Sequence, residues 1–285
     1  MGKKEFYTLP QAMYDLNVVR PILSCKNNAI LHKKLSTDML DMEKVILSHT
    51  LVYIKSGRVK LQTYDYEEFI LNEGEMLFMP RDRYLISDYI NTDKQMDVHL
   101  FFFDHTLTNE FLQSLKTEKL TTKSTITKLN LSQNISNYID TLADTHYKNR
   151  TDEALLKIKL FELLHLVAEV NENFISLLQA HELQKKETDI KTYMLKHYDK
   201  KLTVDEWAML SGYSLSTFTR RFKKETGSSP KKWLIEQNMH MANRDLKDGM
   251  NVSECAAEYG YANTSNFIKA YKEIFHKTPK QHTMT

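Results

Sequence analysis

The sequence predicts an α+β fold, in which an N-terminal β-barrel or β-sandwich with helices precedes an all-helical C-terminal domain. Three observations predict it. Residues 45–104 contain several short β-rich runs separated by turn signals. From Thr106 onward apolar residues recur at three- and four-residue steps, which is typical of amphipathic helices. The last third of the chain then repeats one helix-turn-helix pattern twice. At 285 residues, the chain has the length of about two domains.

The β-rich region has clear breaks between its runs. Ser56-Gly57 predicts a tight turn between residues 45–57 and 58–65, and Pro80 interrupts a later run. The final run, residues 95–104, is apolar at consecutive positions. It therefore predicts a strand that is buried on both faces.

The helical region that follows contains three patterns, of which the last, residues 154–180, is the longest. Its apolar stripe is too wide to remain in water. Two interpretations stay open: the stripe packs on the β-domain, or it forms the seam of a homodimer. A polar run at residues 184–188 predicts a linker between an N-terminal domain of residues 1–183 and a C-terminal domain of residues 189–285. The candidate seam residues are Leu155, Ile158, Phe161, Leu164 and Val167.

The first C-terminal unit, about residues 203–226, has the local signals of a helix-turn-helix. Thr203 and Glu206 have the spacing of a capping box, in which each side chain accepts a hydrogen bond from the other residue's backbone N–H. Gly212 supplies the turn, because glycine tolerates backbone conformations that other residues resist. Ser214 is a suitable N-cap for the second helix.

The second unit, about residues 251–275, repeats this organisation. Gly227 ends the second helix of the first unit, and Pro230 then occupies the first position of a connecting helix, where its missing N–H costs little. Asn251 and Glu254 repeat the capping spacing. The chain therefore contains two helices suited to reading DNA.

The repeat also separates a core face from an outer face on each reading helix. Phe218 aligns with Phe267, and Phe222 aligns with Tyr271, so these aromatic residues form the predicted core. A helix fits the major groove, where its outer side chains can contact base edges, while lysines contact phosphates. The predicted base-reading residues are Leu215, Ser216, Thr219, Arg220, Thr264, Ser265, Asn266 and Lys269. The predicted DNA-backbone residues are Ser214, Lys223, Lys224 and Lys272.

Charge and composition support this prediction and exclude other classes. The net charge of +2 is uneven, because residues 189–285 carry 13 Lys and 3 Arg against 11 Asp and Glu. A basic block of this kind is expected where phosphates bind. The sequence has no apolar run long enough for a membrane span and no secretory signal. The two cysteines are far apart, so we expect a cytoplasmic protein without a disulfide framework.

The C-terminal residues resemble the AraC/XylS family of bacterial transcription regulators. The first copy of the motif contains Ala208, Gly212, Tyr213, Phe218, Phe222, Gly227 and Pro230, and the second contains Ala256, Gly260, Tyr261, Phe267, Tyr271, Phe275 and Pro279. The resemblance implies a seven-helix domain that binds promoter-operator DNA in successive major grooves and acts with RNA polymerase, usually as an activator. One departure is His276, which replaces the usual glycine after the second reading helix.

The N-terminal half resembles the cupin-like regulatory domain of the same family, through GRVKL at residues 57–61 and NEGEMLFMPR at residues 72–81. GEMLFMPRDRYLISD and LLKIKLFELLHL are most similar to ExsA-like activators of type III secretion genes. The resemblance implies a homodimer whose effector is a small molecule or a protein anti-activator. In the ExsA-like subgroup the effector would be a protein.

Two alternatives belong to other classes. A cupin-type metal-dependent enzyme would need clustered histidines and a carboxylate, but His49, His99 and His105 do not form that motif, and no nucleophile motif occurs. We therefore expect no enzyme activity, no metal and no cofactor. An architectural DNA-binding protein is the second alternative, and base-sequence specificity would distinguish it from a regulator.

Overall fold

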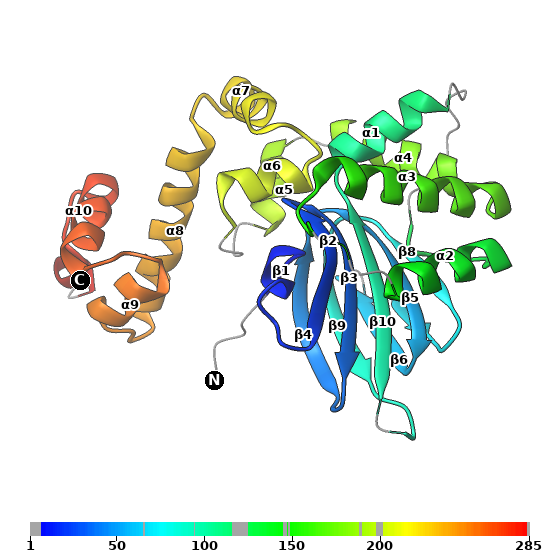
Figure 1. Ribbon diagram of the computed structural model, residues 1–285. Helices are drawn as coiled ribbons and strands as arrows, with labels where there is room; N and C mark the ends of the chain where they lie inside the picture. Colours follow the sequence, from blue (N-terminus) through cyan, green and yellow to red (C-terminus); the bar gives the residue numbers. More distant parts are fainter. Residues whose placement is uncertain are drawn as a thin grey trace. The chain divides into compact units, whose positions relative to one another are not determined.

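The computed structural model describes residues 7–64, 66–93, 95–115, 125–144, 147, 149–187, 190–197 and 202–283. The chain divides into two compact units, residues 1–187 and 188–285. The first unit contains two β-sheets with helices on one side, and the second is helical (Figure 1). None of the described helices is both long and apolar enough to cross a bilayer.

The two sheets of the first unit pack face to face. The five-stranded sheet has the order β1-β4-β9-β6-β7, and the six-stranded sheet has the order β11-β8-β5-β10-β3-β2. Neighbouring strands are antiparallel except β1 and β4, which are parallel. The strands are β1 (Tyr7–Leu9), β2 (Val19–Cys25), β3 (Asn28–Leu35), β4 (Met39–Ile46), β5 (His49–Ser56), β6 (Arg58–Thr63), β7 (Glu68–Leu71), β8 (Met76–Met79), β9 (Arg83–Tyr89), β10 (Met96–Phe103) and β11 (Thr127–Leu129).

The predicted turn at Ser56-Gly57 is confirmed, and it connects the two sheets. Gly57 has φ +90°, and a Cβ atom there would lie 2.7 Å from the backbone oxygen of Tyr89. Because β5 and β6 belong to different sheets, this glycine allows the chain to change sheets within one residue.

Strand β10 is buried on both faces, as its sequence predicts. Val98 and Phe102 face the core between the two sheets, and Phe101 and Phe103 face a second core beneath the helices. This follows from the two-residue period of a strand, which sends alternate side chains to opposite faces. The sequence does not predict β1, β2, β3 or the first part of β4, which lie before residue 45. Pro21 interrupts the β pattern in β2, and His32, Lys33 and Lys34 interrupt it in β3.

Four helices cover the six-stranded sheet: α1 (His105–Ser114), α2 (Gln133–Asp144), α3 (Glu153–Val170) and α4 (Phe174–Glu187) (Figure 1). A short 3-10 helix, η1 (Gln11–Met13), follows β1.

The prediction of one continuous helix over residues 154–180 is wrong, because the chain breaks between α3 and α4. Asn171 ends α3 with non-helical φ −130° and ψ 86°. Its side-chain amide donates to the carbonyl of Val167 at 2.9 Å and to that of Asn130 at 3.1 Å. These bonds satisfy a helix-end carbonyl and fix the break. The predicted linker also differs, since residues 184–187 form the last part of α4.

The second unit contains seven described helices: α5 (Ile190–His197), α6 (Val204–Leu210), α7 (Leu215–Thr226), α8 (Pro230–Lys247), α9 (Val252–Glu258), α10 (Thr264–Phe275) and α11 (Pro279–Thr283). The predicted starts of α7 at Ser214 and of α8 at Pro230 are confirmed, as is the end of α7 at Gly227. The helix α8 contacts both α7 and α10, so it connects the two helix-turn-helix motifs.

Candidate DNA-binding surface

The first helix-turn-helix is positioned by the predicted capping box. The Glu206 N–H donates to the Thr203 hydroxyl at 3.2 Å, and the Thr203 N–H donates to the Glu206 carboxylate at 2.7 Å. Gly212 has φ +71° in the turn, and the Ser214 hydroxyl accepts from the Thr217 N–H at 3.3 Å. Helix α7 therefore begins at Leu215 with its N-terminal N–H groups partly satisfied.

Aromatic residues anchor one face of α7 in the core. Phe218 and Phe222 are fully buried, and the Phe222 ring lies 5.7 Å from that of Trp233 in an edge-to-face contact. Arg221 donates to the Tyr213 hydroxyl, and its guanidinium lies 4.9 Å from the centre of the Tyr213 ring. The Arg221 side chain therefore contacts a residue of its own unit, although Arg221 is adjacent to Arg220 in the sequence.

The opposite face of α7 gathers the predicted reading residues into one shallow, open depression. Leu215, Ser216 and Arg220 are exposed, and Thr219 is half-buried. Within the described part of the chain, Arg220 has no hydrogen-bond or ion-pair partner. Lys224 is exposed beside this face. The depression is lined by Ser214, Leu215, Ser216, Thr219, Arg220 and Lys223.

The second helix-turn-helix has equivalent local geometry. The Glu254 N–H donates to the Asn251 side chain at 2.9 Å, and the Asn251 N–H donates to the Glu254 carboxylate at 3.3 Å, which confirms the capping box. Asn263 caps α10 by accepting from the Asn266 N–H at 2.9 Å. Phe267 is fully buried, as the repeat predicts.

The outer face of α10 is less basic than that of α7. Ser265, Asn266, Lys269 and Lys272 are exposed, and Thr264 is half-buried. The alignment that pairs Phe218 with Phe267 places Lys269 at the position of Arg220. The same alignment places Glu273 where α7 has Lys224, so one positive charge becomes negative.

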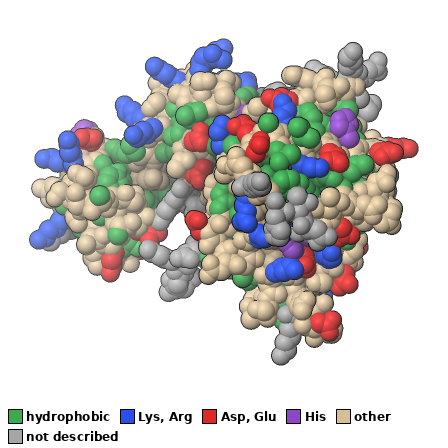
Figure 2. Space-filling view, in the orientation of Figure 1, with side chains coloured by type: hydrophobic (Ala, Val, Ile, Leu, Met, Phe, Trp, Pro, Cys, Tyr) green, Lys and Arg blue, Asp and Glu red, His purple; other side chains and the backbone are tan. Residues whose placement is uncertain are grey.

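The two candidate reading helices are connected by one helix, α8. Helix α8 has 18 residues and therefore extends for about 27 Å. Its buried residues include Trp233 beside α7 and Met239 in the core beside α10. Figure 2 shows Lys and Arg side chains projecting from the surface over α7 and α10. This combination suits contact with two separate segments of a polyanion.

The structure divides the predicted dimer-seam residues into two groups. Leu164 and Val167 are fully buried in the core between α3 and the six-stranded sheet, so they cannot lie on a surface. Leu155 and Phe161 are half-buried against the same core. Ile158 is 62% exposed on α3. Leu164 and Val167 therefore pack within the chain. A dimer contact stays a prediction for Leu155, Ile158 and Phe161.

The space between the sheets is nearly filled by the chain's own side chains. A cavity of about 40 Å³ remains, lined mainly by apolar residues together with Lys33, Lys44 and Asp88. The Asp88 carboxylate pairs with both lysines, and burial, reinforced by the charge of Lys44, lowers the pKa of Lys33 to about 8. A cavity of this size holds a few water molecules, whereas small-molecule sites usually have several hundred Å³.

The three histidines considered from the sequence lie in separate places. His49 lies 3.2 Å from the Glu182 carboxylate, which also accepts from Arg81 at 2.6 Å. Arg81 holds the pKa of Glu182 down at about 2, and the contact with His49 adds to this effect. The network ties α4 to the strand end at His49. His105 begins α1.

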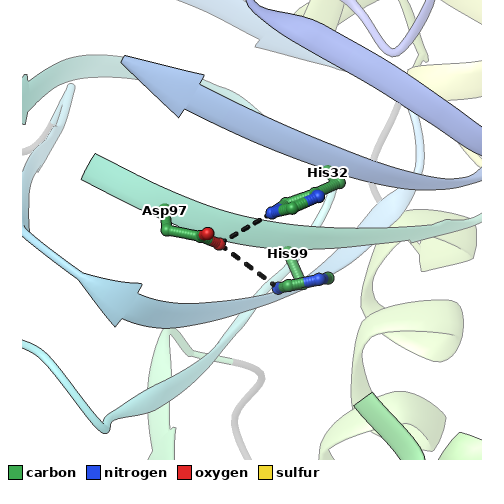
Figure 3. A group of neighbouring side chains, drawn as sticks. All are labelled: His32, Asp97 and His99. Atoms are coloured by element: carbon green, nitrogen blue, oxygen red, sulfur yellow. Dashed lines mark hydrogen bonds and ion pairs between the residues drawn. The ribbon is translucent and has the colours of Figure 1, made fainter. Parts of the chain in front are cut away.

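His99 instead lies beside His32 and Asp97, in a cluster that no motif in the sequence predicts (Figure 3). The cupin-type motif has two histidines one residue apart, followed by a carboxylate. Here the pair at that spacing is Asp97 and His99, and the second histidine comes from a different strand.

Two protein-family models match the chain, one within each of its two units. Residues 49–177 match the family described as the ExsA N-terminal regulatory domain, and residues 207–283 match the helix-turn-helix domain family. The crystal structure of an apo ToxT variant from Vibrio cholerae is 11% identical, covers 92% of this chain and 98% of its own, and has a TM-score of 0.46.

Two curated relatives align with most of the chain. The thermoregulatory protein LcrF of Yersinia pestis is 28% identical over 250 residues, which is 85% of this chain and 88% of LcrF. The virulence regulon transcriptional activator VirF of Yersinia enterocolitica is 27% identical over 233 residues, which is 79% of this chain and 83% of VirF. With an ExsA N-terminal regulatory domain ahead of an AraC-type helix-turn-helix domain, the chain belongs to the AraC/XylS family of transcription regulators.

Proposed function

We propose that this regulator activates transcription by placing α7 and α10 in successive major grooves of a promoter operator. The observation that carries the proposal is the pair of equivalent helices, each anchored by buried aromatic residues and each with an exposed polar face. B-DNA repeats its major groove about every 34 Å. A connecting helix of about 27 Å with a reading helix near each end is compatible with that spacing.

The two helices contribute unequally in this proposal. Arg220 on α7 can make a bidentate contact with guanine, whereas Lys269 at the equivalent position of α10 carries a single ammonium group. The lysines Lys223, Lys224 and Lys272 contact phosphates, and the acidic Glu273 weakens the corresponding contact of α10. We therefore assign most of the affinity and sequence preference to α7.

The β-domain regulates and self-associates in this proposal. Ile158 is an exposed apolar residue on α3, with the half-buried Leu155 and Phe161 on either side of it. This supports a homodimer contact centred on Ile158. The cavity of about 40 Å³ between the sheets supports a protein effector over a small molecule bound there.

The target genes follow from the relatives. VirF is named as an activator of a virulence regulon, and the N-terminal family is that of ExsA. We therefore infer virulence genes, including those of type III secretion, as targets, with RNA polymerase as the partner at their promoters. The named relatives are regulators, so the proposal includes no catalytic step.

Genome-wide footprinting of the protein in cells tests this function. We expect a small number of promoter sites that share one sequence, with two contact regions about one helical turn apart. Transcription from those promoters should fall when Arg220 is replaced by alanine. A Lys191→Ala variant, changed at an exposed position of α5, should behave as wild type. Broad occupancy without a shared sequence would instead identify an architectural DNA-binding protein.

A further inference from the structure

The His32–Asp97–His99 cluster joins two central strands of the six-stranded sheet. His99 on β10 lies directly opposite His32 on β3, and Asp97 lies two residues before His99. Side chains two residues apart share a face of a strand, so all three project from the same face. The pairing with β5 shifts register between Asp97 and Val98, and such an irregularity re-aims the side chains beside it.

The three side chains converge closely. The His32 Nε2 atom lies 2.8 Å from Asp97 Oδ1, and His99 Nδ1 lies 3.9 Å from the same oxygen (Figure 3). The two imidazole rings stack with their centres 4.3 Å apart. One ligand atom from each residue lies within 4.8 Å of the others.

His99 is polar, buried and unsatisfied at this position. The residue is 0% exposed, and neither of its ring nitrogens has a hydrogen-bond partner in the described part of the chain. Buried polar groups normally have partners, so an unpartnered imidazole calls for an explanation.

We propose that His32, Asp97 and His99 bind one divalent transition-metal ion of the zinc class. Two imidazoles with one carboxylate suit zinc, nickel or copper, whereas magnesium and calcium favour oxygen ligands. Ligand atoms in a tetrahedral zinc site lie about 3.4 Å apart, which follows from bonds of about 2.1 Å. Binding requires the His99 ring to turn out of its stack on His32, because a metal ion lies in the plane of each coordinating imidazole and the two ring planes are only 13° from parallel. No hydrogen bond holds the His99 ring against this rotation.

The surroundings of Asp97 support this assignment. The Lys34 ammonium lies 3.3 Å from Asp97 Oδ2, which leaves Oδ1 directed toward the imidazoles. An outer partner of this kind fixes the orientation of a coordinating carboxylate. A bound ion would cross-link β3 and β10 and stabilise the β-domain.

Metal titration of the full chain tests the proposal. The protein is stripped with a chelator and titrated with Zn²⁺ by calorimetry and with Co²⁺ by absorption spectroscopy. We expect one ion per chain, a higher Tm with Zn²⁺, and a Co²⁺ spectrum without thiolate bands, since Cys25 and Cys255 lie outside the cluster. His99→Phe preserves a ring of similar size, and it should weaken binding at least tenfold.

Matched variants complete the test. His32→Gln should weaken binding as His99→Phe does, and His165→Gln, on the exposed face of α3, should bind as wild type. Circular dichroism and DNA affinity establish that each variant is folded, and they also test the DNA-binding function separately. Substoichiometric binding to the wild type, or equal binding to a folded His99→Phe variant, would overturn the proposal.

Discussion

Replacing Arg220 by alanine should remove sequence preference at one base pair of the operator without affecting folding. Arg220 is exposed on α7, and it has no hydrogen-bond or ion-pair partner within the described residues. Surface substitutions away from structural contacts usually change the free energy of unfolding by less than about 0.5 kcal/mol. Any larger effect on DNA affinity therefore reports the contact with DNA.

The size of the effect follows from the type of contact. A bidentate arginine–guanine pair contributes about 1–3 kcal/mol of discrimination, which is a factor of roughly 5 to 150. Lys223, one turn further along the same face, provides the matched comparison. Lys223→Ala should weaken binding to all sequences and reduce the slope of log affinity against log salt by about 1, because it removes one phosphate contact.

The assay is fluorescence anisotropy with three kinds of duplex over a series of salt concentrations. One duplex carries the operator found by footprinting, a second set carries single base-pair changes, and a third has random sequence. Arg220→Ala should lose affinity for the operator yet bind equally to operators that differ at one position. Thermal unfolding of each variant provides the folding control.

Equal losses of Arg220→Ala on the operator and on random DNA would refute base reading by this residue. That result would place Arg220 among the phosphate contacts, and a reduced salt slope would accompany it. An unchanged affinity for every duplex would refute the assignment of the whole α7 face.

Five further substitutions test stability and assembly. Leu164→Ala should lower the free energy of unfolding by about 2–5 kcal/mol at every protein concentration, because it opens a cavity in a filled core. Ile158→Glu should leave the free energy of unfolding unchanged but reduce the fraction of dimer in sedimentation. An unaltered dimer fraction would remove Ile158 from the seam. His276→Gly should raise the free energy of unfolding by about 0.5–1 kcal/mol, since His276 has φ 56° after α10. Gly227→Ala, at φ 75°, should lower it by a similar amount. A decrease for His276→Gly, or an increase for Gly227→Ala, in chemical denaturation would contradict this reasoning. The pKa of Glu182 is depressed to about 2 in the folded state, so its ionised carboxylate contributes fully to the free energy of unfolding above its unfolded pKa of about 4.3. That contribution is lost as pH falls toward 2, and the urea midpoints of wild type and Glu182→Gln should therefore converge over that range. A constant difference between the two midpoints would exclude the charge effect.

The sequence by itself determined the helical half of this protein in detail. The capping boxes at Thr203 and Asn251 and the proline at position 230 located the helix starts correctly. The spacing of Phe218 and Phe222 identified the core face of α7. These signals succeed because capping and helical periodicity act between residues three or four positions apart, so they can be read along the chain.

The tertiary structure alone decided three other features. It showed that Leu164 and Val167 are buried within the chain. It broke the predicted long helix at Asn171, through a hydrogen bond to the distant Asn130. It also brought His32 beside Asp97 and His99. Each of these depends on pairing between segments far apart in sequence, and strand register and helix docking are set by the packing of the whole domain. Local patterns do not contain that information, because many registers satisfy the same alternation of apolar residues.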